Sequence, residues 1–281
     1  MTTDAITLTP TRTPLGGGFR RAARDVAVLT GRNFVHLARE PLRLSDVTIQ
    51  PVLFTLLFVY VFGAGVVVSG GSYTDFAIAG LLAMNLTTSA IGTAVGLSTD
   101  LRSGVIDRLR TLPIWKPSVL VGRSVTDLLS AGLCAAIVIG TGFVVGWRPD
   151  ASPASTLAGV GIFLLFSYAV SWGCACLGLV SQDAESAQGL GLIILFPLAF
   201  VSNALVPTAH MPALLRTIAT WNPVSAVTTA ARELFGNPNP TASIHAWPMQ
   251  HPVLASLVWS LAMLAVFAPL ASALYRRRTT D

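Results

Sequence analysis

Residues 76–98 of the chain read FAIAGLLAMNLTTSAIGTAVGLS, and residues 99–116, which follow directly, read TDLRSGVIDRLRTLPIWK. The first stretch is longer than the roughly 20 residues that an apolar helix needs to cross the hydrocarbon core of a bilayer. The second stretch is short, charged and helix-like, and it separates the first from another apolar run. Together they predict a membrane helix followed by a segment on which a soluble partner docks.

Six apolar runs make up most of the chain, at residues 47–68, 76–98, 119–146, 156–180, 187–206 and 252–274. Hydrophobic residues form 53% of the 281 positions and charged residues only 11%, too few to cover the surface of a soluble domain of this size. Most runs show no alternation of apolar and polar residues, which excludes the strands of a membrane barrel. The sequence therefore predicts an all-α polytopic membrane protein with six transmembrane helices.

We expect residues 1–22 to be a disordered cytoplasmic N-terminus and residues 23–281 to form a single membrane domain. Of the 18 basic residues, seven precede the first run, five lie in or beside the connection after the second run, and three follow the last run. Lys and Arg beside membrane helices concentrate on the cytoplasmic side. Both termini and the charged connection are therefore predicted to be cytoplasmic, which an even number of spans allows.

Residues 24–40 form an amphipathic segment before the first run. Its polar side chains gather on one arc of a helical projection, and the candidates for contact at the membrane surface are Asp25, Arg32, His36 and Arg39. Apolar side chains such as Val26 and Phe34 occupy the opposite arc, and Pro41 ends the pattern. The pattern predicts an interfacial helix on the cytoplasmic surface; a solvated charged tail is the alternative.

The connection after the fifth run, residues 207–251, is long and rich in proline. Apolar residues recur in it every three or four positions, as in a helix, and Asn222-Pro223 interrupts the pattern. We expect two short helices on or in the outer leaflet, the second capped at Gly236. The residues that would form an outer gate are Leu214, Leu215, Ile218, Asn222 and Pro223.

Several kinds of chemistry are missing from the sequence. The one lysine, Lys116, stands outside any phosphate-binding loop, and there is no zinc-protease or serine-hydrolase motif. Five of the six runs hold no ionisable residue well inside; Arg123 and Asp127, near the start of the third, have the spacing of an i,i+4 helical pair. The basic residues flank membrane segments, which argues against nucleic acid as a partner. We expect no metal and no cofactor in this chain.

The polar residues inside the runs are candidates for a substrate path, and these are Asn85, Ser202 and Asn203. Hydrogen bonds between helices are the alternative role. Two Gly-x-x-x-Gly patterns, Gly92 with Gly96 and Gly142 with Gly146, predict close approach of helices.

Residues 103–113, SGVIDRLRTLP, followed by residues 119–123, VLVGR, resemble the cytoplasmic connection of type II ABC exporter permeases, most closely the daunorubicin-resistance (DrrB-like) branch. The motifs LVP at 205–207, WNPVS at 221–225 and REL at 232–234 are similar to the outer segment of that family. The resemblance covers nearly the whole chain, from the amphipathic segment to the last run.

The resemblance implies a dimer of six-span subunits in a bacterial cell membrane, formed by two copies of this chain or by this chain and a paralogue. It implies two separate ABC ATPase subunits that bind ATP and Mg²⁺, so that this chain is not an enzyme by itself. It also implies export of a hydrophobic or amphipathic drug or antibiotic, or of a lipid. The alternatives are a polysaccharide or cell-envelope glycolipid exporter and, in another class, a non-transporting membrane scaffold or immunity protein.

By the same resemblance, the charged connection is a coupling helix seated on the ATPase. Its candidate coupling residues are Arg102, Gly104, Asp107, Arg108, Leu109, Arg110, Leu112 and Pro113. The glycine would allow close approach, the charged residues would form polar contacts, and the leucines would fill a pocket. An amphipathic loop whose arginines only set the topology is the alternative.

The predicted topology can be measured with a reporter fused after Asp281. We expect a fluorescent protein to fluoresce there and alkaline phosphatase to be inactive, because the phosphatase folds only outside the cytoplasm. A fusion after residue 240, in the predicted outer connection, should give the reverse result. High phosphatase activity at the C-terminus would mean an odd number of spans.

Overall fold

The computed structural model describes residue 31 and, with gaps at 64, 67, 69 and 209–210, residues 41–104, 118–240 and 246–278. The predicted disordered segment 1–22 and the interfacial candidates Asp25, Arg32, His36 and Arg39 lie outside this part of the chain. The described residues form helices joined by turns and bends. The elements are α2 (Pro41–Leu57), η1 (Phe58–Phe62), α3 (Tyr73–Ser89), α4 (Ile91–Arg102), α6 (Ser118–Val144), α7 (Pro153–Val180), α8 (Ala184–Phe200), α9 (Ala213–Trp221), α10 (Pro223–Phe235), α11 (Trp247–Gln250) and α12 (Pro252–Arg278).

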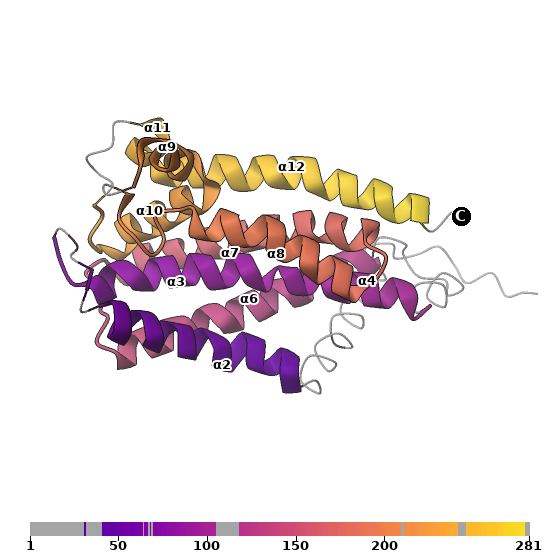
Figure 1. The fold of residues 1–281 in the computed structure, drawn as a ribbon, viewed down its shortest axis with the longest axis horizontal. Coiled ribbons are helices and arrows are strands. Elements are labelled where there is room, and N and C mark those ends of the chain that lie inside the picture. Colours follow the sequence, from indigo (N-terminus) through magenta and orange to yellow (C-terminus); the bar gives the residue numbers. More distant parts are fainter. Residues whose placement is uncertain are drawn as a thin grey trace, which may run out of the picture.

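The long helices lie side by side along one axis as a bundle (Figure 1). Helices α9, α10 and α11 gather at one end, which we call the hairpin end. Helix α4 and the C-terminal half of α12 extend to the opposite end, which we call the α4 end. Two hydrogen bonds fasten the α4 end: Arg102 Nε donates to Gln182 O at 2.8 Å, and an Arg278 Nη donates to Val180 O at 3.5 Å.

Four helical segments of the described residues are long and apolar enough to cross a membrane, and they are Tyr73–Arg102, Val121–Val144, Pro153–Val180 and Pro252–Arg278. They correspond to the second, third, fourth and sixth predicted runs. The two remaining apolar helices, Val47–Phe62 and Ala184–Phe200, are shorter. Four of the predicted spans thus have helices of full length.

The predicted ends of the first and fifth runs were wrong. The first helix ends at Phe62, where Gly63 begins a turn, instead of continuing to residue 68. Helix α8 ends at Phe200, and residues 201–206 form a bend although they are mostly apolar. Hydropathy cannot detect this end, because the bend is held by hydrogen bonds from residues distant in sequence.

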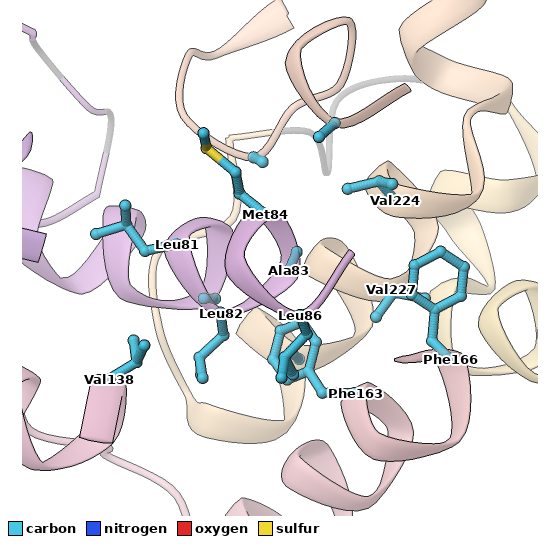
Figure 2. Close-up of a cluster of buried hydrophobic side chains, with 14 of the residues drawn as sticks. Leu81, Leu82, Ala83, Met84, Leu86, Val138, Phe163, Phe166, Val224 and Val227 are labelled. Carbon is cyan, nitrogen blue, oxygen red and sulfur yellow. The ribbon is translucent and has the colours of Figure 1, made fainter. Parts of the chain in front are cut away.

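Helix α3 is the centre of the bundle. It is apolar on all sides, and such a helix must be covered all round. Leu82 and Leu86 are buried in one cluster with side chains from three neighbouring helices, which Figure 2 labels as Val138 of α6, Phe163 and Phe166 of α7, and Val224 and Val227 of α10. In the most apolar window of Tyr73–Arg102, 78% is buried, against 17% for Pro252–Arg278. The second run is therefore the core, and α12 lies at the periphery.

Polar residues cap the helices at both ends of the bundle. Ser72, Ser152 and Asn222 accept hydrogen bonds from the first turns of α3, α7 and α10. At the α4 end, the backbone N–H of Ser186 donates to the Asp183 carboxylate at 2.7 Å, and this bond to the charged form lowers the pKa of Asp183. Gly236 ends α10 with φ of 70°, as the predicted cap requires.

Gly80 in the middle of α3 permits a close backbone contact in the core. A Cβ built at Gly80 would lie 1.7 Å from the carbonyl oxygen of Ala204, in the bend after α8. Both groups in this contact belong to the backbone, so neither can move aside as the end of a flexible side chain would. Gly80 is therefore what lets the bend rest on α3.

We expect Gly80→Ala to lower the free energy of unfolding by about 1–3 kcal/mol, because the added methyl group must push the bend away from α3. The matched control is Gly161→Ala in α7, where a Cβ would meet nothing within 4 Å. Thermal unfolding of both variants in detergent measures the difference. Equal melting temperatures would show that the contact is unimportant.

Candidate functional site

The bend at residues 201–206 is where two distant parts of the chain meet at the hairpin end. The last carbonyl groups of a helix have no partner within the helix and must find one elsewhere. Here the side chain of Asn222 supplies it, since Nδ2 donates to Leu198 O at 2.7 Å and to Val201 O at 2.6 Å. The Oδ1 of the same side chain accepts from the N–H of Val224 at 2.8 Å. Asn222 therefore caps the end of α8 and the start of α10 together.

Arg232 of α10 fills the space between the bend and α3. Its side chain is fully buried, and its guanidinium donates to Phe76 O at 3.0 and 3.1 Å, to Asn203 O at 3.1 Å and to Ala204 O at 2.8 Å. The guanidinium carbon also lies 3.6 Å from the centroid of the Phe76 ring. One side chain thus joins three elements: α3, the bend after α8, and α10.

No carboxylate among the described residues forms an ion pair with Arg232. The charge is met by the carbonyl dipoles of Asn203 and Ala204 in the bend and of Phe76 in α3, and by the face of the Phe76 ring. A buried charge is tolerated only with such compensation. The contacts fix the position of α10 on the bundle.

The predicted substrate-path residues all form hydrogen bonds within the protein. Asn203 donates from its backbone N–H to Ser225 Oγ at 2.9 Å and from Nδ2 to Thr229 Oγ1 at 2.7 Å. Ser202 Oγ donates to Ala199 O at 2.6 Å, and Asn85 Nδ2 donates to Leu81 O at 2.8 Å within α3. Asn203 thus links the bend to α10, while Asn85 bonds within its own helix. Their contact with a substrate stays a prediction.

The predicted gate residues lie on α9 and at its junction with α10. Leu214, Leu215 and Ile218 are 73%, 41% and 49% exposed, whereas Ala219 and Thr220, toward the C-terminal end of α9, are buried. Asn222 and Pro223 separate the two helices at the predicted position. Among the described residues of this chain, none covers the apolar face of α9.

The predicted coupling residues divide between the described and undescribed parts of the chain. Arg102 is the last residue of α4, and Gly104 follows with φ of 66°, a left-handed turn at which the charged connection begins. The other candidates, Asp107, Arg108, Leu109, Arg110, Leu112 and Pro113, lie outside the described residues. The described residues contain no group of three His, Cys, Asp or Glu side chains that could hold a metal ion.

Sequence reasoning missed the role of Arg232, which lies within the predicted outer connection, residues 207–251. A signal was present in α10. Asn222, Ser225, Thr229 and Arg232 recur at intervals of three, four and three, which is one face of a helix. Such a polar stripe on an otherwise apolar helix indicates partners in the protein.

We expect Arg232→Leu to lower the free energy of unfolding by about 2–4 kcal/mol, because it leaves buried carbonyl oxygens without donors. The free energy of unfolding of Arg232→Lys should fall between those of the unchanged protein and of Arg232→Leu. A single ammonium group cannot reach all three acceptors in the geometry of the planar guanidinium. The control is Arg216→Leu on exposed α9. Thermal unfolding in detergent is the measurement, and equal stability of the two leucine variants would contradict the assignment.

The chain is similar over most of its length to known transporter proteins. Residues 24–235 match the family model described as ABC-2 type transporter. The chain is 33% identical to the daunorubicin resistance ABC transporter permease protein DrrB1 of Streptomyces coeruleorubidus, over 99% of both chains. It is 26% identical to the probable doxorubicin resistance ABC transporter permease protein DrrC of Mycobacterium tuberculosis, over 99% of this chain and 98% of the other.

A third relative is the putative transport permease ycf38 of Porphyra purpurea, which is 27% identical over 76% of this chain and 75% of its own length. The match to the family model spans well over half of the chain, and the similarity to DrrB1 spans nearly all of it. The apolar helices agree with a multi-pass membrane protein. The chain belongs to the ABC-2 type transporter family, as a DrrB-like permease.

Proposed function

We propose that this chain is the transmembrane subunit of an ATP-driven exporter, which moves hydrophobic or amphipathic small molecules, drugs and antibiotics among them, or lipids. The substrate would leave from the cytoplasm or the inner leaflet of a bacterial cell membrane. Support comes from the family, and from relatives named for resistance to daunorubicin and doxorubicin.

In this proposal the two shorter helical segments, Val47–Phe62 and Ala184–Phe200, are also spans, giving six. The hairpin end then faces outward, and the α4 end, with both termini, faces the cytoplasm. Arg276, Arg277 and Arg278 at the end of α12, with Arg102 at the end of α4, place positive charge at the proposed cytoplasmic end.

Energy would come from two separate ATPase subunits that bind ATP and Mg²⁺ and dock on residues 102–113 and on the interfacial helix. Support for a second permease subunit, identical or paralogous, comes from the open apolar faces of α8 and α9. On α8, Ile193 is 72% exposed, and Phe196 and Phe200 are 48% and 42% exposed. A membrane or a partner subunit can cover such a surface.

The observation that carries the proposed substrate class is the contrast between the centre and the outer faces of the bundle. Side chains fill the core around α3, and the side chains of Asn85 and Ser167 there donate to carbonyl oxygens of α3. The exposed face of α8 is apolar and carries no charged residue after Glu185. A substrate that moves along this face must itself be largely apolar, because the helix offers nothing to replace the water around a charge.

The function is tested by co-expressing the chain with its ATPase and measuring ATP-dependent daunorubicin uptake into inside-out vesicles. We expect uptake to persist when an uncoupler collapses the proton gradient at constant ATP, and to stop when the ATPase loses its phosphate-loop lysine. Uptake of a glycolipid or polysaccharide without any apolar drug would favour the alternative exporter. Absence of any ATP-dependent transport would favour a scaffold or immunity protein.

The proposed path makes a residue-level prediction. Ile193→Asn and Phe196→Asn should lower daunorubicin transport at least fivefold, since each places an amide on the apolar face of α8. Leu261→Asn on α12 is the matched control, because Leu261 is 57% exposed on a helix outside the proposed path. Equal transport by all three variants would contradict a path along α8.

A further inference from the structure

Helices α4 and α6 border the charged connection on its two sides, since α4 ends at Arg102 and α6 begins at Ser118. Their packing partners differ. Helix α4 packs mainly on α7 and α8, whereas α6 packs on α2, α3 and α7. Apolar packing therefore does little to hold the ends of α4 and α6 to each other, although the same connection leaves both.

Arg123 of α6 spans this gap. Nη2 donates to the carbonyl oxygen of Gly92 in α4 at 2.7 Å, and Nη1 lies 4.0 Å from Oδ2 of Asp100, also in α4. On its own helix, Nε of Arg123 lies 3.4 Å from Oδ1 of Asp127. Thr93 of α4 completes the cluster, because its hydroxyl donates to Oδ2 of Asp127 at 2.8 Å.

The charged side chains of the cluster are largely shielded from water: Arg123, Asp100 and Asp127 are only 15%, 25% and 17% exposed. Ion pairs removed from water are weakened less by solvent and salt than pairs on the surface. Sequence alone predicted an ordinary i,i+4 pair of Arg123 with Asp127. That pair is present, but two further contacts of Arg123 reach the other helix.

Gly96 makes room for the bridge. A Cβ at Gly96 would lie 2.0 Å from Nη2 of Arg123, so any larger residue would occupy the place of the guanidinium. Gly92, one turn earlier, has nothing within 4 Å of a built Cβ and contributes its carbonyl oxygen instead. The Gly-x-x-x-Gly pattern in α4 therefore packs against an arginine side chain of α6 at this place.

We propose that Arg123 is a positioning residue for energy coupling, which holds the ends of α4 and α6 together so that both spans follow a displacement of the charged connection. The proposal rests on the proposed function. A push on residues 103–117 reaches the bundle through two helix ends that pack on different neighbours. Without the bridge the ends separate and the displacement is lost; with it, the same displacement moves two spans at once.

The test uses the full exporter with its ATPase and measures the number of substrate molecules moved per ATP hydrolysed. Arg123→Gln removes the charge, and Gly96→Ala displaces the guanidinium without changing any charge. We expect both to lower this ratio at least fivefold while complex assembly and ATP hydrolysis stay near normal. The ratio for Arg123→Lys should lie between those of the unchanged protein and of Arg123→Gln. Arg277 is an exposed arginine at the same end, and Arg277→Gln should behave as the unchanged protein.

A second measurement does not depend on transport. Spin labels at Thr99 on α4 and Leu129 on α6 report the distance between the two helices in the purified complex. We expect a longer or broader distance distribution in Arg123→Gln and in Gly96→Ala. Distances that change in a complex without ATP-dependent transport would support the bridge and contradict the proposed function.

Two results would overturn the proposed coupling role of Arg123. One is an unchanged distance distribution in both variants. The other is an unchanged number of substrate molecules moved per ATP in both variants. If transport, ATP hydrolysis and melting temperature all fall in proportion, Arg123 only stabilises the fold. If all three stay normal, Arg123 has no role in coupling.

Discussion

The buried guanidinium of Arg232 is the interaction on which the hairpin end depends. The chain breaks its fifth apolar run after Phe200 in a bend, whose residues Ser202, Asn203 and Ala204 are buried, and this leaves buried carbonyl oxygens in need of donors. Arg232 and Asn222 satisfy them from α10. The same contacts place α10 against α3, and Gly80 allows the bend to lie close enough for the bonds to form. These contacts therefore join the end of α8, the hairpin helix α10 and the core helix α3.

Each end of the bundle contains an arginine shielded from water, and the groups that compensate its charge differ between the two ends. At the hairpin end a cation bonds to backbone carbonyls and carries no carboxylate partner among the described residues. At the α4 end, Arg123 also donates to one backbone carbonyl, that of Gly92, but in addition it pairs with two carboxylates on two helices. Carbonyl bonds hold a fixed geometry, since each acceptor belongs to a packed backbone. An ion pair between side chains tolerates some movement, which suits the end that is proposed to receive force.

Much of the fold could be read from apolar runs and turn residues. Four spans have helices close to their predicted limits, and Asn222-Pro223 and Gly236 divide and end the hairpin helices where the pattern placed them. The roles of the polar residues inside the bundle were harder to predict. Asn85 and Asn203 look alike in sequence, yet Asn85 bonds within its helix and Asn203 links two elements. Only the position of a partner distant in sequence separates these roles.

The sequence by itself determined that the chain is helical, that it lives in a bilayer, and which family it resembles, because these depend on composition, run length and local motifs. Tertiary structure decided which run is central, where the fifth helix ends, and what Arg232 and Arg123 bond to. Those outcomes depend on contacts between residues up to 156 positions apart, such as Arg232 with Phe76. The periodicity of a sequence predicts which residues share one face of a helix, but not which element that face contacts. The contacting element determines whether the charge of a buried arginine is compensated.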